Sequence, residues 1–233
     1  MNSNRKIAMI VGFLFIIATV VGVAGGRVLD SALSKSNWLG LVSTNANTIK
    51  IGVTLMLIAA LASVSIAVWL YPVLKKYNPY LALTAVIFRA IEAVFYIVAV
   101  AVTLPLIALG QEYLKAGSPD SSYFQTIGNY VLTIKDGSGF FFAVIPFALG
   151  ALAYYYIFYQ SRLVPRWLSV WGILSCLALL VASFSALFSG PPFAIAGGWM
   201  ILAAPIALQE MVLAVWLIVK GFNPSAIASE AAK

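Results

Sequence analysis

The chain has 233 residues, of which 63% are hydrophobic and only 9% charged, and its mean hydropathy is +1.01. Several apolar runs approach or exceed about 20 residues, the length that crosses roughly 30 Å of hydrocarbon as a helix, so the composition excludes a soluble protein. The net charge of +7 comes largely from lysines and arginines that flank these runs, as topology signals do, and no stripe suited to nucleic acid is visible.

Two residue types that often carry chemistry are scarce. Histidine is absent, and Cys176 is the only cysteine and lies within an apolar run. The usual haem and zinc ligand and the usual base of a nucleophilic triad are therefore missing, as are a CxxC motif and an intrachain disulfide. We expect no metal and no cofactor, and we favour a binding protein over an enzyme.

The first predicted span covers residues 7–26 and follows Arg5 and Lys6. A cleaved signal peptide is the alternative, but it needs a shorter apolar core of about 7–15 residues and a clear small-residue cleavage site. Gly22 and Gly26 form a GxxxG step, which lets helices approach closely. The step predicts either local packing or contact with a second copy or another membrane protein.

The second predicted span covers residues 49–74 and the third residues 80–109. The second ends in aromatic residues before Lys75 and Lys76, which is typical of an aromatic belt with positive charge beneath it. Small residues recur along it at four-residue steps: Ala59, Ser63 and Ala67. Pro105 is expected to kink the third span near its far end.

The connection between residues 110 and 139 is the longest and most polar. Asp120 is a candidate N-cap for a helix in this connection. The apolar residues that follow share one face of that helix, namely Tyr123, Phe124, Ile127, Tyr130, Val131 and Ile134. We predict a short amphipathic helix lying on the outer surface, either as an interfacial anchor or as a lid over a cavity. Residues 136–139, Asp-Gly-Ser-Gly, are expected to break the chain after it.

The remaining predicted spans cover residues 140–159, 167–188 and 199–219. The runs Phe140 to Phe142 and Tyr154 to Tyr156 are explained best by lipid contact and an interfacial belt, because consecutive residues point around a helix. Six spans place both termini on one side. That side collects seven of the 14 basic residues, namely Arg5, Lys6, Lys75, Lys76, Arg162, Arg166 and Lys220, whereas the other side holds Arg27, Lys35, Lys50, Lys115 and Lys135. The positive-inside rule therefore predicts cytoplasmic termini.

Three charged residues interrupt these spans: Arg89 and Glu92 in the third and Glu210 in the sixth. Such charges are rare because each costs about 2.5–3.5 kcal/mol on insertion scales, and they usually face a bundle interior and pair. Arg89 and Glu210 each lie ten residues from the cytoplasmic edge, so the helix rise puts both at a depth of roughly 15 Å. Glu92 shares a helix face with Arg89. We expect Arg89 to bridge both carboxylates if these spans are neighbours.

The cluster holds two formal negative charges and one positive charge, an imbalance that a proton or a cation would relieve. It predicts a binding or permeation module for a proton, a small cation or an amine-bearing lipophile. The structural alternative is that the cluster, aided by Gln209, only holds the spans in register. A non-catalytic partner subunit and an intramembrane enzyme for a lipid-like substrate are further alternatives. We interpret Asp136 as the partner of Lys135 in a surface ion pair, and a role in a permeation pathway is the alternative.

Four ordered segments carry a family resemblance: residues 69–75, 88–93, 161–168 and 210–221. Together they resemble the bacterial membrane family catalogued as domain of unknown function 4386, over nearly the whole chain. The resemblance implies a six-helix bacterial integral membrane protein and no established activity. We expect a single transmembrane domain over residues 1–233. Arg89 and Glu210 fall within the shared segments. The expected location is the bacterial cytoplasmic (inner) membrane, with the lipid bilayer and no nucleic acid as partner.

Overall fold

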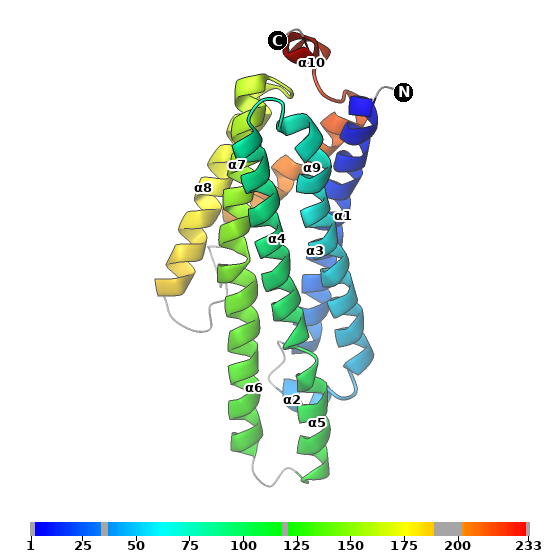
Figure 1. The fold of residues 1–233 in the computed structure, drawn as a ribbon. Coiled ribbons are helices and arrows are strands. Elements are labelled where there is room, and N and C mark those ends of the chain that lie inside the picture. Colours follow the sequence, from blue (N-terminus) through cyan, green and yellow to red (C-terminus); the bar gives the residue numbers. More distant parts are fainter. Residues whose placement is uncertain (1–2, 34–36, 118–120, 189–201, 232–233) are drawn as a thin grey trace.

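The computed structural model describes residues 3–33, 37–117, 121–188 and 202–231, and these residues form helices without a strand. Figure 1 shows them as an elongated bundle with both termini at one end. The elements are α1 (Ser3–Leu33), α2 (Trp38–Leu41), α3 (Ala46–Leu74), α4 (Pro79–Ala101), α5 (Pro105–Lys115), α6 (Ser121–Asp136), the π-helix η1 (Gly137–Phe142), α7 (Val144–Ser161), α8 (Arg166–Phe188), α9 (Ala204–Val219) and α10 (Pro224–Ala231).

Five helical stretches within the described ranges are long and apolar enough to cross a membrane. They are Ser3–Leu33, Ala46–Leu74, Pro79–Lys115, Ser122–Ser161 and Arg166–Phe188. Helix α9 is apolar but has only 16 residues, and the predicted start of its span, residues 199–201, lies outside the described residues. The prediction of an all-α polytopic membrane bundle is confirmed, with five spans meeting the length criterion.

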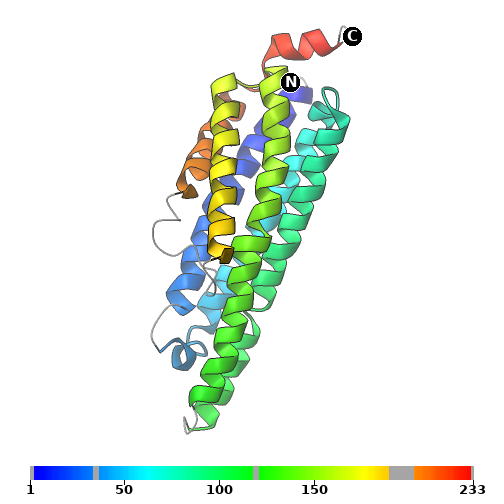
Figure 2. The same ribbon diagram turned by 90° about the vertical axis from the view of Figure 1, so that its left-hand side faces the viewer.

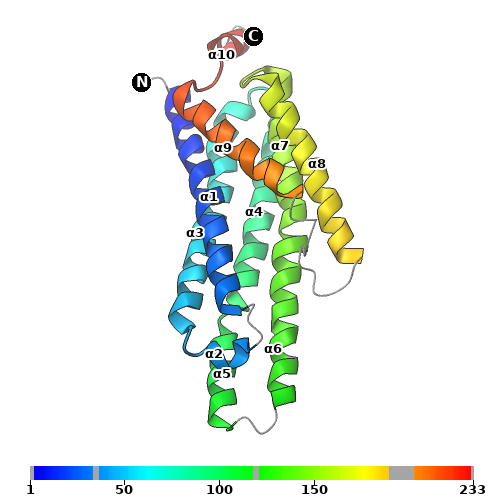
Figure 3. The same cartoon turned by 180° about the vertical axis from the view of Figure 1, so that it is seen from behind.

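The long helices form a closed ring in which each packs on the next. The order is α1, α3, α4, α7, α8 and α9, and α9 returns to pack on α1. Figure 3 shows α9 crossing obliquely between α1 and α8. Short connections explain two of these contacts, α3 with α4 and α7 with α8, because helices joined by a few residues pack as antiparallel neighbours. Helices α4 and α9 are not neighbours in the ring, so side chains that join them must cross the interior.

Helix α4 begins at a defined residue, which fixes how far Arg89 lies from that end of the bundle. Asn78 has extended backbone angles, its side chain accepts a hydrogen bond from the Leu81 amide at 3.0 Å, and Pro79 opens the helix. Asparagine before a proline at the first helical position is a strong start signal. At its far end the helix is interrupted over residues 102–104, just before Pro105, where we expected a kink.

The break that we expected at residues 136–139 is absent. Helix α6 continues into α7 through η1, giving one stretch of 40 residues, Ser122–Ser161. Within η1 the Ala143 amide donates to the Ser138 carbonyl, five residues earlier, at 2.9 Å. A π-turn keeps backbone groups hydrogen-bonded while the helix takes in an extra residue, which suits a segment shielded from water. The prediction was wrong because glycine and serine favour a turn only where water can bind the free backbone groups. In a segment shielded from water those groups must stay hydrogen-bonded within the helix.

The amphipathic helix exists as α6, but it does not lie across the bundle. It stands along the bundle axis beside α5 (Figures 1 and 2). Phe124, Ile127 and Val131 are partly buried, whereas Tyr123 and Tyr130 are exposed. At about 1.5 Å per residue the α6–η1–α7 stretch extends roughly 60 Å, about twice the hydrocarbon thickness. We therefore expect the α5–α6 hairpin to project beyond the membrane. Asp120, the expected cap, lies outside the described residues.

Candidate functional site

Arg89 of α4 lies at the centre of the ring with only 1% of its surface exposed. Its Nη1 atom donates to Ser63 Oγ of α3 at 2.9 Å and to Glu92 Oε2 at 3.0 Å, and its Nη2 atom donates to the hydroxyl of Tyr154 of α7 at 2.8 Å. The guanidinium group thus joins three neighbouring helices. These charge-assisted bonds offset much of the cost of burying the charge.

Glu92 is almost fully engaged by the same partners. Arg89 binds one of its oxygens, and Ser63 Oγ donates to the other at 2.9 Å. The pair is also a helical i, i+3 pair whose side chains are 1% and 3% exposed. Arg89, Glu92 and Ser63 therefore form a closed, electrically neutral triad.

Glu210 of α9 is held more loosely. Its Oε1 atom lies 3.6 Å from Arg89 Nη2, which is an ion pair beyond hydrogen-bonding distance, and its Oε2 atom accepts from Thr19 Oγ1 of α1 at 2.9 Å. The structure thus brings together all three charged side chains that the sequence singled out. It does so across the interior, although α4 and α9 are not neighbours in the ring, the condition that we had set for the bridge.

Aromatic rings enclose the cluster on the α7 side. The Phe147 ring centre lies 4.3 Å from the Arg89 guanidinium carbon, and the Tyr154 ring centre lies 5.5 Å from it. Arg89 Nε has no hydrogen-bond partner among the described residues, so the Phe147 contact is part of its compensation. Tyr154 and Tyr155 are fully buried, and only Tyr156 of the three tyrosines is exposed. Our assignment of this run to lipid contact was wrong for the first two, since one face of α7 points inward.

Gln209 is buried, and its side-chain hydrogen bonds go to residues outside the charged cluster. The Tyr155 hydroxyl donates to its Oε1 atom, and its Nε2 atom donates to the Leu168 carbonyl of α8 at 3.0 Å. These bonds join α7, α8 and α9. Gln209 therefore supports the position of Glu210, its neighbour in sequence, without facing it.

A cavity of about 390 Å³ ends at this cluster. Its charged end is formed by Arg89, Glu92 and Glu210 with Thr19 and Tyr96, and most of its remaining wall is apolar. Asp30, Lys135 and Asp136 also line it, at the α6 side. The volume falls in the range of small-molecule sites, which are mostly apolar with a few placed polar groups.

Asp136 does pair with its neighbour, at 2.8 Å from Lys135 Nζ, but the pair is not on an open surface. Both side chains are only 17% exposed, and both line the cavity at the start of η1. The π-turn that follows also brings Gly139 and Phe140 to the cavity wall. Asp136 is thereby placed on the cavity, although our first interpretation was a simple surface pair.

Gly22 and Gly26 lie on the wall of the same cavity. A Cβ atom added at Gly22 would meet Ala59 of α3 at 3.4 Å, and one added at Gly26 would meet nothing within 4 Å. The glycines thus leave open space inside the bundle. Their contact with a second copy or a membrane partner stays a prediction.

Several site residues were not singled out from the sequence. Thr19 and Tyr96 stand in apolar runs where a single polar group attracts little attention, and Ser63 was noted only for its size. The sequence signal that could have identified all three is a hydroxyl group at the same depth in the membrane as the charged residues. No group of three histidine, cysteine, aspartate or glutamate residues that could hold a metal ion occurs in the part of the chain that the structure describes.

The family model described as "Domain of unknown function (DUF4386)" matches residues 10–221. No curated protein and no solved structure matches the chain.

Proposed function

The chain belongs to the DUF4386 family, and we propose that it binds an amine-bearing lipophile inside the bundle, where the Glu210 carboxylate is the counter-ion of the ligand's ammonium group. One observation carries the proposal. An apolar cavity of about 390 Å³ ends at a carboxylate that the protein itself neutralises only in part.

The charge balance distinguishes Glu210 from Glu92. Arg89 and Glu92 cancel each other within hydrogen-bonding distance, and Arg89 reaches Glu210 only at 3.6 Å. An uncompensated carboxylate in a low-dielectric interior costs several kcal/mol. A cationic group in the cavity would supply the missing partner.

The shape and lining of the cavity favour an organic cation over a proton or a metal ion. A proton needs no apolar volume, and a small metal ion needs several oxygen ligands around it. The charged end offers Glu210 with the hydroxyl of Thr19 and the ring of Tyr96, whereas the remaining wall is mostly apolar. An ammonium group beside Glu210 with an alkyl chain along the cavity fits both parts.

The extent of the cavity favours binding over an open pathway. Among the described residues, its lining runs from the cluster toward α6 and includes none of the basic side chains at the end that holds the termini. The Lys135–Asp136 pair marks the side from which we propose that the ligand enters.

The test compares decylamine with decanol, a neutral molecule of the same chain length, on the detergent-purified protein. We expect decylamine to raise the Tm in a concentration-dependent way, because a ligand that binds only the folded state stabilises it by mass action. Decanol should produce a much smaller shift. Glu210→Gln removes the negative charge of the carboxylate while keeping a similar side-chain shape. It should abolish the difference between the Tm shifts that decylamine and decanol cause.

A second pair of variants checks that the probe occupies the cavity. Gly26→Leu places a side chain in open space on the cavity wall, and Ala24→Leu places the same side chain at an exposed position on the same helix. Gly26→Leu should weaken the decylamine effect and Ala24→Leu should not. Equal shifts with decanol, or an undiminished effect in Glu210→Gln, would contradict the proposal.

A further inference from the structure

A second pocket, of about 590 Å³, opens at the end of the bundle that holds both termini. Two connections form it, the turn between α7 and α8 and the segment between α9 and α10. The Asn223 amide donates to the Leu163 carbonyl at 2.8 Å and ties them together. Leu163 and Phe222 are buried and give the pocket an apolar floor.

The rim of this pocket is basic. Arg162, Arg166 and Lys220 line it, and all three are exposed. None of them pairs with a carboxylate whose side chain the structure describes. Three cations that pair with no described carboxylate repel one another around this depression, although Arg166 also donates to the Tyr159 carbonyl at 3.5 Å. An anion bound among them would relieve that repulsion.

The helix ends reinforce the positive potential. Helix α8 begins at Arg166 on the pocket rim, so its first-turn amide groups and the positive end of its dipole add to the cations. The negative end of α9 is already occupied, because Arg5 donates to the Leu217 and Ile218 carbonyls. The C-terminus of α9 therefore competes little with an anion for the pocket.

The surroundings place the pocket at the level of lipid headgroups. Tyr159 and Trp167, at the facing ends of α7 and α8, are exposed as in an aromatic belt, and Trp216 lines the pocket itself. Exposed apolar side chains continue from it along α8 and α9, including Leu174 and Val215. We propose that this pocket binds the phosphate headgroup of an anionic lipid, whose acyl chains lie against α8 and α9.

The test measures the Tm of the purified protein in detergent after addition of phosphatidylglycerol, phosphatidylcholine or inorganic phosphate at matched ionic strength. We expect phosphatidylglycerol to give the largest rise and inorganic phosphate almost none. Arg162→Gln combined with Arg166→Gln should lose most of the difference between the two lipids. Lys220→Gln should lose part of it and serves as the milder variant if the double variant folds poorly.

Lys75→Gln combined with Lys76→Gln is the matched control. It removes the same charge at the same end of the bundle, but from the turn between α3 and α4, outside the pocket. It should keep the preference for phosphatidylglycerol. An equal loss in both double variants would show a diffuse surface effect, and an equal rise with inorganic phosphate would show a site for free anions; either result overturns the proposal. Both outcomes are independent of the decylamine experiment.

Discussion

Arg89 is the residue on which the polar interior depends most directly. It is fully enclosed by side chains from its neighbouring helices, and its partners Ser63, Glu92 and Tyr154 are all buried. Its removal would leave Glu92 as a buried charge without a counter-ion. The neutral triad is therefore the structural element of the cluster, and Glu210 is the residue to which we assign the proposed ligand.

We expect Arg89→Met to lower the free energy of unfolding by about 3–5 kcal/mol, the range for breaking a buried ion pair by removing one partner. Glu92→Gln should also be strongly destabilising. Combined with Arg89→Met, it should cost much less than the sum of the two, because no buried charge of the pair remains. A double-mutant cycle by denaturant titration in mixed micelles measures this coupling.

Glu112→Gln is the control for that cycle. Glu112 pairs with Lys115 at 2.8 Å, but the two side chains are 61% and 71% exposed, so the substitution should change stability by less than about 1 kcal/mol. Additive effects of Arg89→Met and Glu92→Gln would refute the closed triad. A Glu210→Gln variant as unstable as Arg89→Met would make Glu210 part of the structural unit as well.

At the scale of the helices, the space around glycines decides how closely α1 approaches its neighbours. At Gly12 an added Cβ would lie 2.8 Å from the Ala214 carbonyl oxygen of α9. This contact is with backbone, which cannot rotate away. At Gly26, on the same helix, an added Cβ meets nothing within 4 Å.

We therefore expect opposite results from the same substitution at these two positions. Gly12→Ala should destabilise the protein by about 1–3 kcal/mol by forcing α1 and α9 apart. Gly26→Ala should be neutral or stabilising by up to about 1 kcal/mol, because alanine is the better helix former. Thermal unfolding of both variants under one condition provides the comparison. A loss of equal size at both positions would contradict the packing of α1 against α9.

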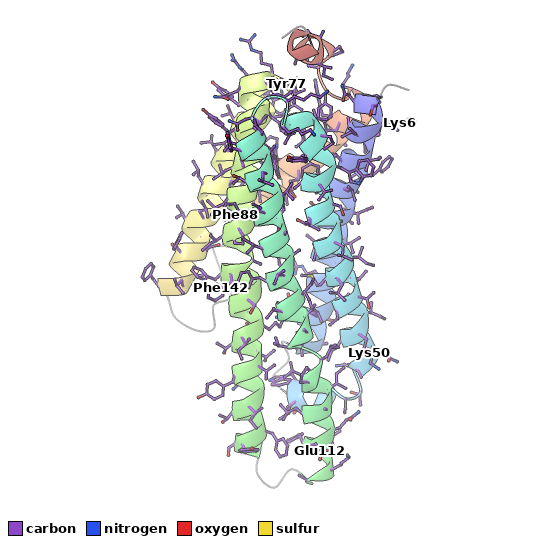
Figure 4. The ribbon with its side chains drawn as sticks, viewed as in Figure 1. Lys6, Lys50, Tyr77, Phe88, Glu112 and Phe142 are labelled. Carbon is purple, nitrogen blue, oxygen red and sulfur yellow. The ribbon has the colours of Figure 1, made fainter. Side chains whose placement is uncertain are left out.

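At the scale of the whole molecule, charge and length are distributed unevenly along the bundle axis. Figure 4 shows Lys6 and Tyr77 near the end with the termini and Glu112 near the other. The first end carries more basic side chains than the other, which mixes both signs, with Asp30, Glu112 and Asp136. The positive-inside rule predicts that the end with the termini faces the cytoplasm and that the α5–α6 hairpin projects from the opposite face.

Cysteine labelling tests this orientation. In a Cys176→Ala background, Glu112→Cys should react with a membrane-impermeant maleimide on intact cells. Lys76→Cys, an exposed position at the other end, should react only after the cells are permeabilised. The reverse pattern would place the termini outside. The buried native Cys176 should stay unlabelled in the unmodified chain.

Much of this architecture follows from the sequence by local arguments. The apolar runs indicate the spans, and Asn78-Pro79 marks the start of α4. The depths of Arg89 and Glu210 follow from the helix rise, and Glu92 faces Arg89 because helical neighbours three residues apart share a face. Each of these inferences needs only a few adjacent residues and the thickness of the bilayer.

The sequence by itself thus determined the helical membrane class, the family resemblance and the charged residues of the site. Only the tertiary structure decided that Ser63, Thr19 and Tyr154 meet those charges, that η1 joins α6 to α7, and that a cavity remains beside Glu210. The reason is physical. Partition of a segment into lipid depends on its own composition, whereas the rotation of each helix about its axis depends on packing and on hydrogen bonds with residues far away in the chain.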